Sequence, residues 1–308
     1  MPQGVRVRVS PPAQILLHLM LIQEFKSKEI SAEVNEVSFS WESPSNIALV
    51  KYWGKNLDQT PKNPSISFTL SDCKTTTSVL FKKIKNTSKI IDFELFFEGE
   101  RNISFRTKIE KFFSSIVGYC PFLSDYHLTI SSSNSFPHSS GIASSASAMS
   151  ALSLCIMSLE KELTLIDDEF FYKKASFISR IGSGSACRSI YGGINFWGTH
   201  SDFSFGSDLY STQISKSISS KFHNYRDAIL IIDEGKKEVS SSVGHELMND
   251  NPFSQIRFKL AKNNISNLMS ILESGNLNEF CNLVESEALM LHSLMMSSTP
   301  SYLSLIHI

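Results

Sequence analysis

The chain has 308 residues, 42% of them hydrophobic, which is enough to bury a full core and to form two domains. Its 29 basic and 30 acidic residues nearly balance, so electrostatics gives no reason to expect binding to nucleic acid or to an acidic membrane. Five cysteines lie far apart, without a C-x-x-C pair or a histidine at zinc-ligand spacing. This argues against metal sites and disulfides and favours a reducing, cytoplasmic location.

Residues 1–36 are expected to form an N-terminal extension. The longest apolar run in it, residues 15–22, follows Arg6 and Arg8 in the order of a signal peptide, but His18 interrupts it. This run is too short to cross a bilayer, and no small-residue cleavage site follows it. We therefore expect neither secretion nor a membrane span, and Met20 is an alternative start.

Short alternating segments separated by turns begin near Val37. The stretch 43–55 is typical of a strand that ends in a cluster of Lys51, Tyr52, Trp53, Gly54 and Lys55. Two lysines, a hydroxyl and a glycine suit a phosphorylated substrate, whereas the alternative is a strand end with solvated lysines. Two half-buried strands are predicted next, at 64–70 and 75–81, and an amphipathic helix within 102–120.

A strand predicted at 126–131 leads into a loop of small and hydroxyl-bearing residues, 135–147, and then into a helix that includes 149–159. The first N–H groups of a helix have no partners inside it, and its dipole places partial positive charge there. Gly141 would let the backbone approach a ligand closely. The loop therefore predicts a phosphate site; the alternative is a well-capped structural helix.

Another helix is predicted from Asp167 to about Ile181, followed by a glycine- and serine-rich stretch, 182–193, that contains Arg188. A guanidinium can hold a carboxylate through two parallel hydrogen bonds. The alternative for a lone arginine is a solvated or structural ion pair. The four glycines of the stretch favour the ligand role, because they permit close backbone approach.

A serine- and lysine-rich segment, 211–220, is predicted to link two domains. A buried strand is expected at 228–233, and helices at about 252–272 and 278–295. One strand and two helices leave a hydrophobic face without enough partners, so the C-terminal part is expected to be cut short. The expected organisation is an N-terminal domain over 37–215 and a partial C-terminal domain over 222–308.

Three stretches together carry a resemblance to a known family. Residues 137–146, Pro-x-x-x-Gly-Ile-Ala-Ser-Ser-Ala, are similar to the phosphate loop of the GHMP kinase superfamily. Residues 45–55 and 182–193 resemble the diphosphomevalonate decarboxylase family within it, as do residues 236–244, and the likeness runs in order from about Trp41 to Pro300. No Walker-type loop, dinucleotide fingerprint or G-x-S-x-G elbow is present to favour another class.

The resemblance implies an α+β fold of the GHMP kinase type, with an N-terminal ribosomal-protein-S5-like domain and a truncated C-terminal GHMP domain. It implies that ATP phosphorylates the C3 hydroxyl of mevalonate 5-diphosphate, after which phosphate and CO2 leave and isopentenyl diphosphate remains. Magnesium would accompany ATP, without a metal site made of protein residues. A homodimer is also implied.

The resemblance further implies which residues form the site, with Arg188 on the substrate carboxylate. Substrate binding would use Lys51, Tyr52, Trp53, Gly54, Lys55, Ser183, Gly184, Ser185, Ala186, Cys187, Arg188 and Ser242. The ATP phosphates would be held by Pro137, Ser139, Ser140, Gly141, Ile142, Ala143, Ser144, Ser145 and Ala146.

One feature of the family is missing from this sequence. The family's catalytic aspartate lies in an Asp-Ala-Gly-Pro-Asn segment, which does not occur here, so the general-base role is assigned to no residue. Weak binding and little or no turnover are therefore expected. The alternatives are a kinase of mevalonate or its phosphate that does not decarboxylate, and a non-catalytic nucleotide-binding fragment.

Overall fold

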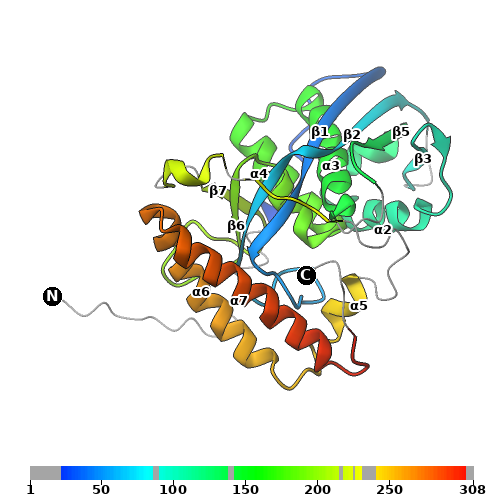
Figure 1. Ribbon diagram of the computed structural model, residues 1–308. Helices are drawn as coiled ribbons and strands as arrows, with labels where there is room; N and C mark the ends of the chain where they lie inside the picture. The colour runs from blue at the N-terminus through cyan, green and yellow to red at the C-terminus, as the bar shows by residue number, and fades with distance from the viewer. Residues whose placement is uncertain are drawn as a thin grey trace.

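The computed structural model describes residues 22–85, 90–137, 142–214, 218–224, 226–230 and 241–302, with backbone alone at 241 and 242. It has the expected α+β fold, with helices packed on a mixed sheet (Figure 1). Seven strands form the sheet: β1 Glu36–Val50, β2 Ser65–Lys83, β3 Asp92–Phe97, β4 Glu100–Arg101, β5 Tyr126–Asn134, β6 Ile194–Trp197 and β7 Ser211–Ile214.

The long strand β2 organises this sheet. The strand order is β4-β3-β5-β2-β6-β7, with β1 on the other side of β2. The first residues of β2 pair with β6 and its second half pairs with β5, while β1 runs antiparallel along both parts. Among the described strands, only β3 and β5 are parallel neighbours. Because β2 spans both parts of the sheet, it connects the core near α3 with the region where β1 ends.

Three sequence predictions need correction. The strands predicted at 64–70 and 75–81 form one continuous strand, because the residues between them stay extended and contain no glycine or proline. The segment predicted as a linker at 211–220 begins with β7, whose four residues pair with β6 inside the sheet. Residues 228–230 are exposed and lie in no strand of the described chain, so that part of the run predicted at 228–233 is also wrong; 231–233 lie outside the described residues.

The predicted helices are confirmed. The helices are α2 Arg106–Ile116, α3 Ser144–Leu163, α4 Asp168–Gly182, α5 Ser241–Glu246, α6 Ser254–Ser274 and α7 Leu277–Met296, with short 3-10 turns η1 Pro121–Asp125, η2 Gly184–Ser189 and η3 Ser220–Phe222. Side-chain caps define two of the starts: Asp167 accepts the N–H of Phe170 at 2.7 Å, and Asn276 accepts that of Glu279 at 3.3 Å. Gly275, at φ +72°, ends α6.

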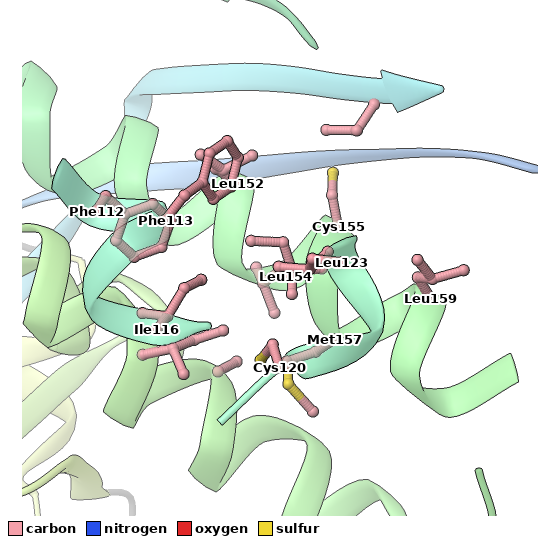
Figure 2. Close-up of a cluster of buried hydrophobic side chains, with 14 of the residues drawn as sticks. Phe112, Phe113, Ile116, Cys120, Leu123, Leu152, Leu154, Cys155, Met157 and Leu159 are labelled. Atoms are coloured by element: carbon pink, nitrogen blue, oxygen red, sulfur yellow. The ribbon is translucent and has the colours of Figure 1, made fainter. Parts of the chain in front are cut away.

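The main hydrophobic core lies between the sheet and helices α2, α3 and α4. On β5, Tyr126, Leu128 and Ile130 point into it at every second position, as a strand with one buried face requires. Phe112, Phe113 and Ile116 of α2 meet Leu152 and its neighbours on α3 (Figure 2). The helix α3, which begins at the predicted phosphate loop, is therefore held rigidly.

A second core lies where α6 and α7 cover the end of the sheet. The two helices lie side by side below β1 and β6 (Figure 1). Ala261, Ile265 and Leu268 of α6 pack against Leu49 of β1 and Ile66 of β2, among others. This contact joins the two halves of the chain beside the end of β1.

Residues just before β1 also pack on the N-terminal half. The Phe25 ring is fully buried and stacks on Phe177 of α4 with ring centroids 4.1 Å apart. The backbone N–H of Ser31 donates to the carbonyl of Leu163 at 2.8 Å. The boundaries of the two domains stay a prediction.

We expect Leu128→Ala to lower the free energy of unfolding by about 2 to 5 kcal/mol, because it removes a fully buried side chain and leaves a cavity in the main core. Leu165, which is 86% exposed, provides the control, and Leu165→Ala should change stability by less than about 0.5 kcal/mol. Urea unfolding of both variants measures the difference; equal losses would contradict this assignment of the core.

Candidate functional site

The cluster predicted at Lys51–Lys55 directly follows β1, and we call these five residues the Lys51–Lys55 segment. Tyr52 and Trp53 are each 8% exposed, so their rings are packed rather than solvated. Gly54 has φ +92°, and a Cβ there would lie 3.1 Å from the Phe258 ring. Both its backbone angle and this close contact require glycine.

The glycine-rich stretch 182–193 forms η2 immediately after α4, and it lies against the Lys51–Lys55 segment. A Cβ at Gly184 would approach the Tyr52 hydroxyl to 2.8 Å, so glycine makes room for that ring. The Arg188 guanidinium carbon lies 6.0 Å from the centre of the Tyr52 ring and 5.7 Å from that of Trp197. The structure thus brings together two stretches far apart in the sequence.

Arg188 is a buried cation that forms no ion pair with any acidic residue in the part of the chain that the structure describes. It is 3% exposed, its Nη1 donates to Ser65 Oγ at 2.6 Å, and its Nε has no hydrogen-bond partner. Burial lowers the pKa of the guanidinium below its ordinary value. Because an unpaired buried charge is costly, the arrangement favours a bound anion.

The start of α3 is suited to a second anion. Ala143 precedes the helix with φ +53° and makes no side-chain cap, and the first turn contains no acidic residue. The positive end of a 20-residue helix dipole therefore has no acidic side chain beside it in that turn. Ser145 Oγ of α3 lies 3.5 Å from Ser183 Oγ, so the two predicted binding sites adjoin each other.

A cleft of about 650 Å³, counting space open to solvent, opens beside the start of α3. Its walls include Ser144, Ser145, Met149 and Leu152 of α3, and Phe97 and Phe105 from the opposite side. Ser132 and Asn134, at the end of β5, also line it. Mostly apolar walls with a few polar groups are typical of small-molecule sites.

Lys108 of α2 also lines this cleft, and the sequence analysis did not single it out. The residue as a whole is exposed, yet the pKa of its ammonium is lowered, first by loss of hydration and then by repulsion from Lys55. Loss of hydration lowers the pKa of Lys55 as well, while Glu246 opposes this. Two ammonium groups that repel each other beside a helix start would be stabilised by an anion.

His245 of α5 fixes the Lys51–Lys55 segment from the opposite side. Its Nδ1 accepts the Gly54 N–H at 3.0 Å, and its ring lies 4.4 Å from the Tyr52 ring centre and 4.5 Å from that of Trp53. Burial lowers the pKa of His245 to about 3, and the charges of Lys55 and Arg188 act in the same direction. The ring is therefore neutral at physiological pH and able to accept this hydrogen bond.

The other predicted site residues are placed as follows. Ala186 and Cys187 are fully buried within η2, and their part in substrate binding stays a prediction. The backbone of Ser242 lies in α5, near the segment that His245 contacts, while nothing is described of its side chain. Pro137 is exposed, Ile142 is buried and Ala146 is buried at the start of α3, whereas Ser139, Ser140 and Gly141 lie outside the described residues.

Asn46 is a further residue that the sequence analysis missed. Its Nδ2 donates to the Ser185 carbonyl at 3.1 Å and to Ser189 Oγ at 2.7 Å, which fixes η2 relative to β1. The available signal was an asparagine directly before the apolar run Ile47–Val50 of a predicted strand, since buried polar side chains need specific partners.

No three His, Cys, Asp or Glu side chains come close enough to hold a metal ion together within the described ranges. Likewise, none of the helices seen in this structure is both long and apolar enough to cross a membrane.

Comparison with known proteins gives consistent similarities. Residues 43–211 match the model of the diphosphomevalonate decarboxylase-like N-terminal domain. Diphosphomevalonate decarboxylase of Saccharomyces cerevisiae is 36% identical over 219 residues, which are 67% of this chain and 52% of the relative. The chain spans about half the length of the curated relatives it matches.

Solved structures agree with this. Mevalonate diphosphate decarboxylase from Staphylococcus aureus superposes with a TM-score of 0.71 and 27% identity, covering 88% of this chain and 78% of that one. A complex of MDDEF with MVAPP, AMPPCP and magnesium gives a TM-score of 0.70 and 25% identity, covering 87% and 78%.

We expect His245 to make stability fall as the pH is lowered from neutrality. The unfolded chain takes up a proton below the ordinary pKa of 6.5, whereas the folded chain does so only near 3, so the stabilisation is complete above 6.5 and lost below it. Between about pH 6.5 and 5 the loss is about 2 kcal/mol, since one pKa unit is worth about 1.4 kcal/mol.

His245→Gln tests this, because the amide oxygen can still accept the Gly54 N–H but does not titrate. Urea unfolding at both pH values should show a smaller loss in this variant than in the parent chain. His223→Gln, at an exposed position, is the matched control and should behave like the parent. Identical pH dependence in His245→Gln and the parent would refute the assignment.

Proposed function

The chain belongs to the diphosphomevalonate decarboxylase family of the GHMP kinase superfamily, and on that premise we propose that it uses ATP to decarboxylate mevalonate 5-diphosphate to isopentenyl diphosphate. The reaction would phosphorylate the C3 hydroxyl and form ADP. Loss of phosphate and CO2 from that intermediate would then leave the double bond of the product. This is a step of the mevalonate pathway of isoprenoid synthesis.

The observation that carries the proposal is the buried, unpaired guanidinium of Arg188. A ligand carboxylate would supply the negative charge that no described residue supplies, and a planar guanidinium can hold it through two hydrogen bonds. Fixing the carboxylate fixes the direction of the C–C bond that breaks. Burial also raises the pKa of the Tyr52 hydroxyl, which keeps it protonated as a hydrogen-bond donor beside the same site.

The diphosphate would be bound by the ammonium groups of the Lys51–Lys55 segment. Loss of hydration lowers the pKa of Lys51 as well as that of Lys55, so each ammonium would gain from a nearby anion. Ser183, just before η2, and Gly184 and Ser185 within it would position the rest of the substrate.

ATP would lie in the cleft beside α3, with its phosphates at the start of that helix. Three features fit it: the absence of an acidic residue in the first turn, the ammonium of Lys108, and a mostly apolar cleft that suits a purine. The contact between Ser145 and Ser183 would place the transferred phosphoryl group beside the substrate.

Magnesium would neutralise phosphate charge when ATP is bound. It typically keeps several waters and takes substrate phosphates as ligands, so the lack of a carboxylate cluster among the described residues is compatible with it. Hydroxyls at the start of α3, such as those of Ser144 and Ser145, would lie beside phosphates bound there and could hold a water of the ion. The solved complex of MDDEF with MVAPP, AMPPCP and magnesium supports this assignment of ligands.

The chemistry would depend on positioning and charge neutralisation. Phosphoryl transfer needs the two reactants aligned and the growing charge on the phosphoryl oxygens compensated, which a helix start and nearby cations provide. The general-base role is assigned to none of the residues of this chain. We also propose a cytoplasmic location, which the five free cysteines support, and a homodimer.

Product analysis with ATP, magnesium and mevalonate 5-diphosphate tests the proposed function. We expect ADP and CO2 in equal amounts, at a low rate. ADP without CO2 would instead support a kinase of mevalonate or its phosphate. Binding of both ligands with neither product would support a non-catalytic nucleotide-binding protein.

We further expect Arg188→Lys to weaken binding of mevalonate 5-diphosphate by on the order of tenfold or more, because a point charge cannot replace a two-pronged contact. Binding of an ATP analogue should change by less than about twofold, since Arg188 lies in the other half of the site. Calorimetric titration of both ligands measures this, and similar losses for the two would count against the role of Arg188.

A further inference from the structure

Arg257 of α6 and Glu287 of α7 form a buried ion pair outside the stretches so far assigned to ligands. Their side chains are 1% and 0% exposed, and two parallel hydrogen bonds of 2.8 Å join them. Asn264 Nδ2 makes a third hydrogen bond to the Glu287 carboxylate, donating to Oε1 at 2.6 Å. The pair is thus fully desolvated and rigidly held.

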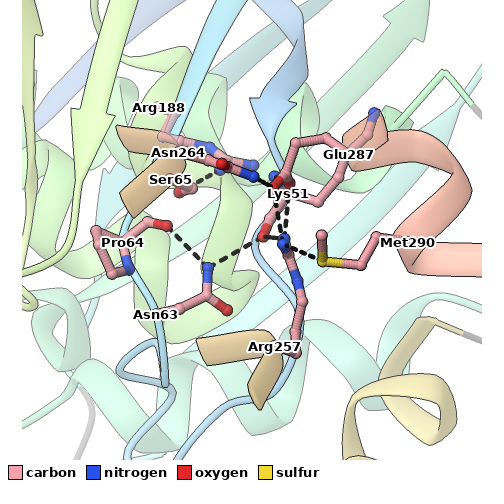
Figure 3. A network of polar contacts seen from close by, with 9 residues as sticks. All are labelled: Lys51, Asn63, Pro64, Ser65, Arg188, Arg257, Asn264, Glu287 and Met290. Carbon is pink, nitrogen blue, oxygen red and sulfur yellow. Dashed lines mark hydrogen bonds and ion pairs between the residues drawn. The ribbon is translucent and has the colours of Figure 1, made fainter. Parts of the chain in front are cut away.

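This ion pair contacts both backbone groups of one residue, Lys51 (Figure 3). The Lys51 N–H donates to Glu287 Oε2 at 3.0 Å, and Arg257 Nη2 donates to the Lys51 carbonyl at 2.8 Å. Asn63 Nδ2 donates to the same carbonyl at 3.0 Å. Lys51 follows the last residue of β1, so these side chains replace the ladder hydrogen bonds that the sheet would otherwise give.

The Lys51–Lys55 segment is therefore held at two points by residues that come much later in the chain. The Lys51 backbone is fixed by α6 and α7, and the Gly54 N–H is fixed by His245 of α5. Tyr52 and Trp53 lie between the two points. Fixing the backbone on both sides determines where these rings and the flanking ammonium groups can lie.

A buried ion pair usually adds little to the stability of the folded state. Removing two charges from water costs about as much as their attraction returns, and apolar residues of similar size often stabilise a core as well. Charged groups do make strong, directional hydrogen bonds to backbone groups. The geometry here uses that property, since each partner of the pair bonds a different group of the same peptide residue.

We propose that Arg257 and Glu287 are positioning residues, which preorganise the Lys51–Lys55 segment for the diphosphate substrate by holding both backbone groups of Lys51. The inference rests on the proposed function and extends it to two residues that need not touch the substrate. Without the pair, the segment would sample other backbone positions, and binding would have to select the competent one.

The chain provides a matched control in the pair Lys174–Glu160. Both of its side chains are 0% exposed and lie 2.6 Å apart, and Lys174 also bonds a backbone carbonyl, that of Tyr119, at 2.8 Å. This pair joins α3 to α4 in the main core and makes no contact with the Lys51–Lys55 segment in the described structure. Breaking either pair should lower stability, so stability alone does not distinguish their roles.

The experiment compares Glu287→Gln with Glu160→Gln in the full chain, at a temperature where circular dichroism shows both variants folded. The first measurement uses no ligand: amide hydrogen exchange resolved for residues 51–54. We expect exchange at Lys51 and Gly54 to rise at least about tenfold in Glu287→Gln and to stay unchanged in Glu160→Gln.

The second measurement is calorimetric titration with mevalonate 5-diphosphate. We expect on the order of tenfold weaker binding in Glu287→Gln, with an ATP analogue bound as by the parent chain. The exchange result is needed beside the affinity, because removing the negative charge of Glu287 also lowers the pKa of Lys51 further and so affects the charge of the segment itself. Weaker binding together with faster exchange at Lys51 indicates lost positioning.

Unchanged exchange at Lys51, or unchanged or tighter substrate binding in Glu287→Gln, would overturn the inference. Equal effects in Glu160→Gln would also overturn it, because they would show that Arg257 and Glu287 act only through overall stability. If the parent chain binds no mevalonate 5-diphosphate, the proposed function fails, and the substrate role of the pair falls with it even if the exchange result holds.

Discussion

A guanidinium buried without a carboxylate is the constraint that the rest of this site depends on. Arg188 is kept in place by Ser65 and by the faces of Tyr52 and Trp197, all of which are neutral. Such contacts fix the geometry of a cation but do not neutralise it, and burial makes its charge more costly and any partner more strongly bound. The surrounding fold therefore holds a buried positive charge in a fixed position, which favours binding of an acidic ligand.

The strand β2 explains how two halves of the chain come to share one site. Near its start, Ser65 faces η2 and bonds Arg188, while the next residue, Ile66, packs with α6 on the other side. Successive side chains of a strand point to opposite faces of the sheet. Arg188 therefore lies on one face of the start of β2, and α6 packs on the other. The Lys51–Lys55 segment leaves the neighbouring strand at this level and receives contacts from both sides.

Local chemistry made part of this predictable from the sequence. Small residues before an apolar run predicted the start of α3. The glycine-rich stretch with one arginine predicted close backbone approach to a ligand, which stays a prediction; the structure shows instead that Gly184 makes room for the Tyr52 ring. The family resemblance supplied the fold. The segment at 211–214 was misjudged because serine-rich composition is typical of linkers, although pairing with β6 buries Ser211 and Ile214.

Contacts between distant parts of the chain could not be predicted in the same way. His245 and Gly54 are 191 residues apart and Arg257 and Lys51 are 206 apart, and such pairs leave no periodic pattern in a single sequence. Lys108 likewise looks like one of many helix-surface lysines until α2 is packed beside the start of α3. In each case tertiary packing gave an ordinary residue its role.

A crystal structure of the chain with bound mevalonate 5-diphosphate tests the central claim most directly. The account predicts the ligand carboxylate within hydrogen-bond distance of two guanidinium nitrogens of Arg188, with the diphosphate beside the Lys51–Lys55 segment. A ligand bound elsewhere, or an Arg188 that is paired instead with a carboxylate of its own chain, would contradict it.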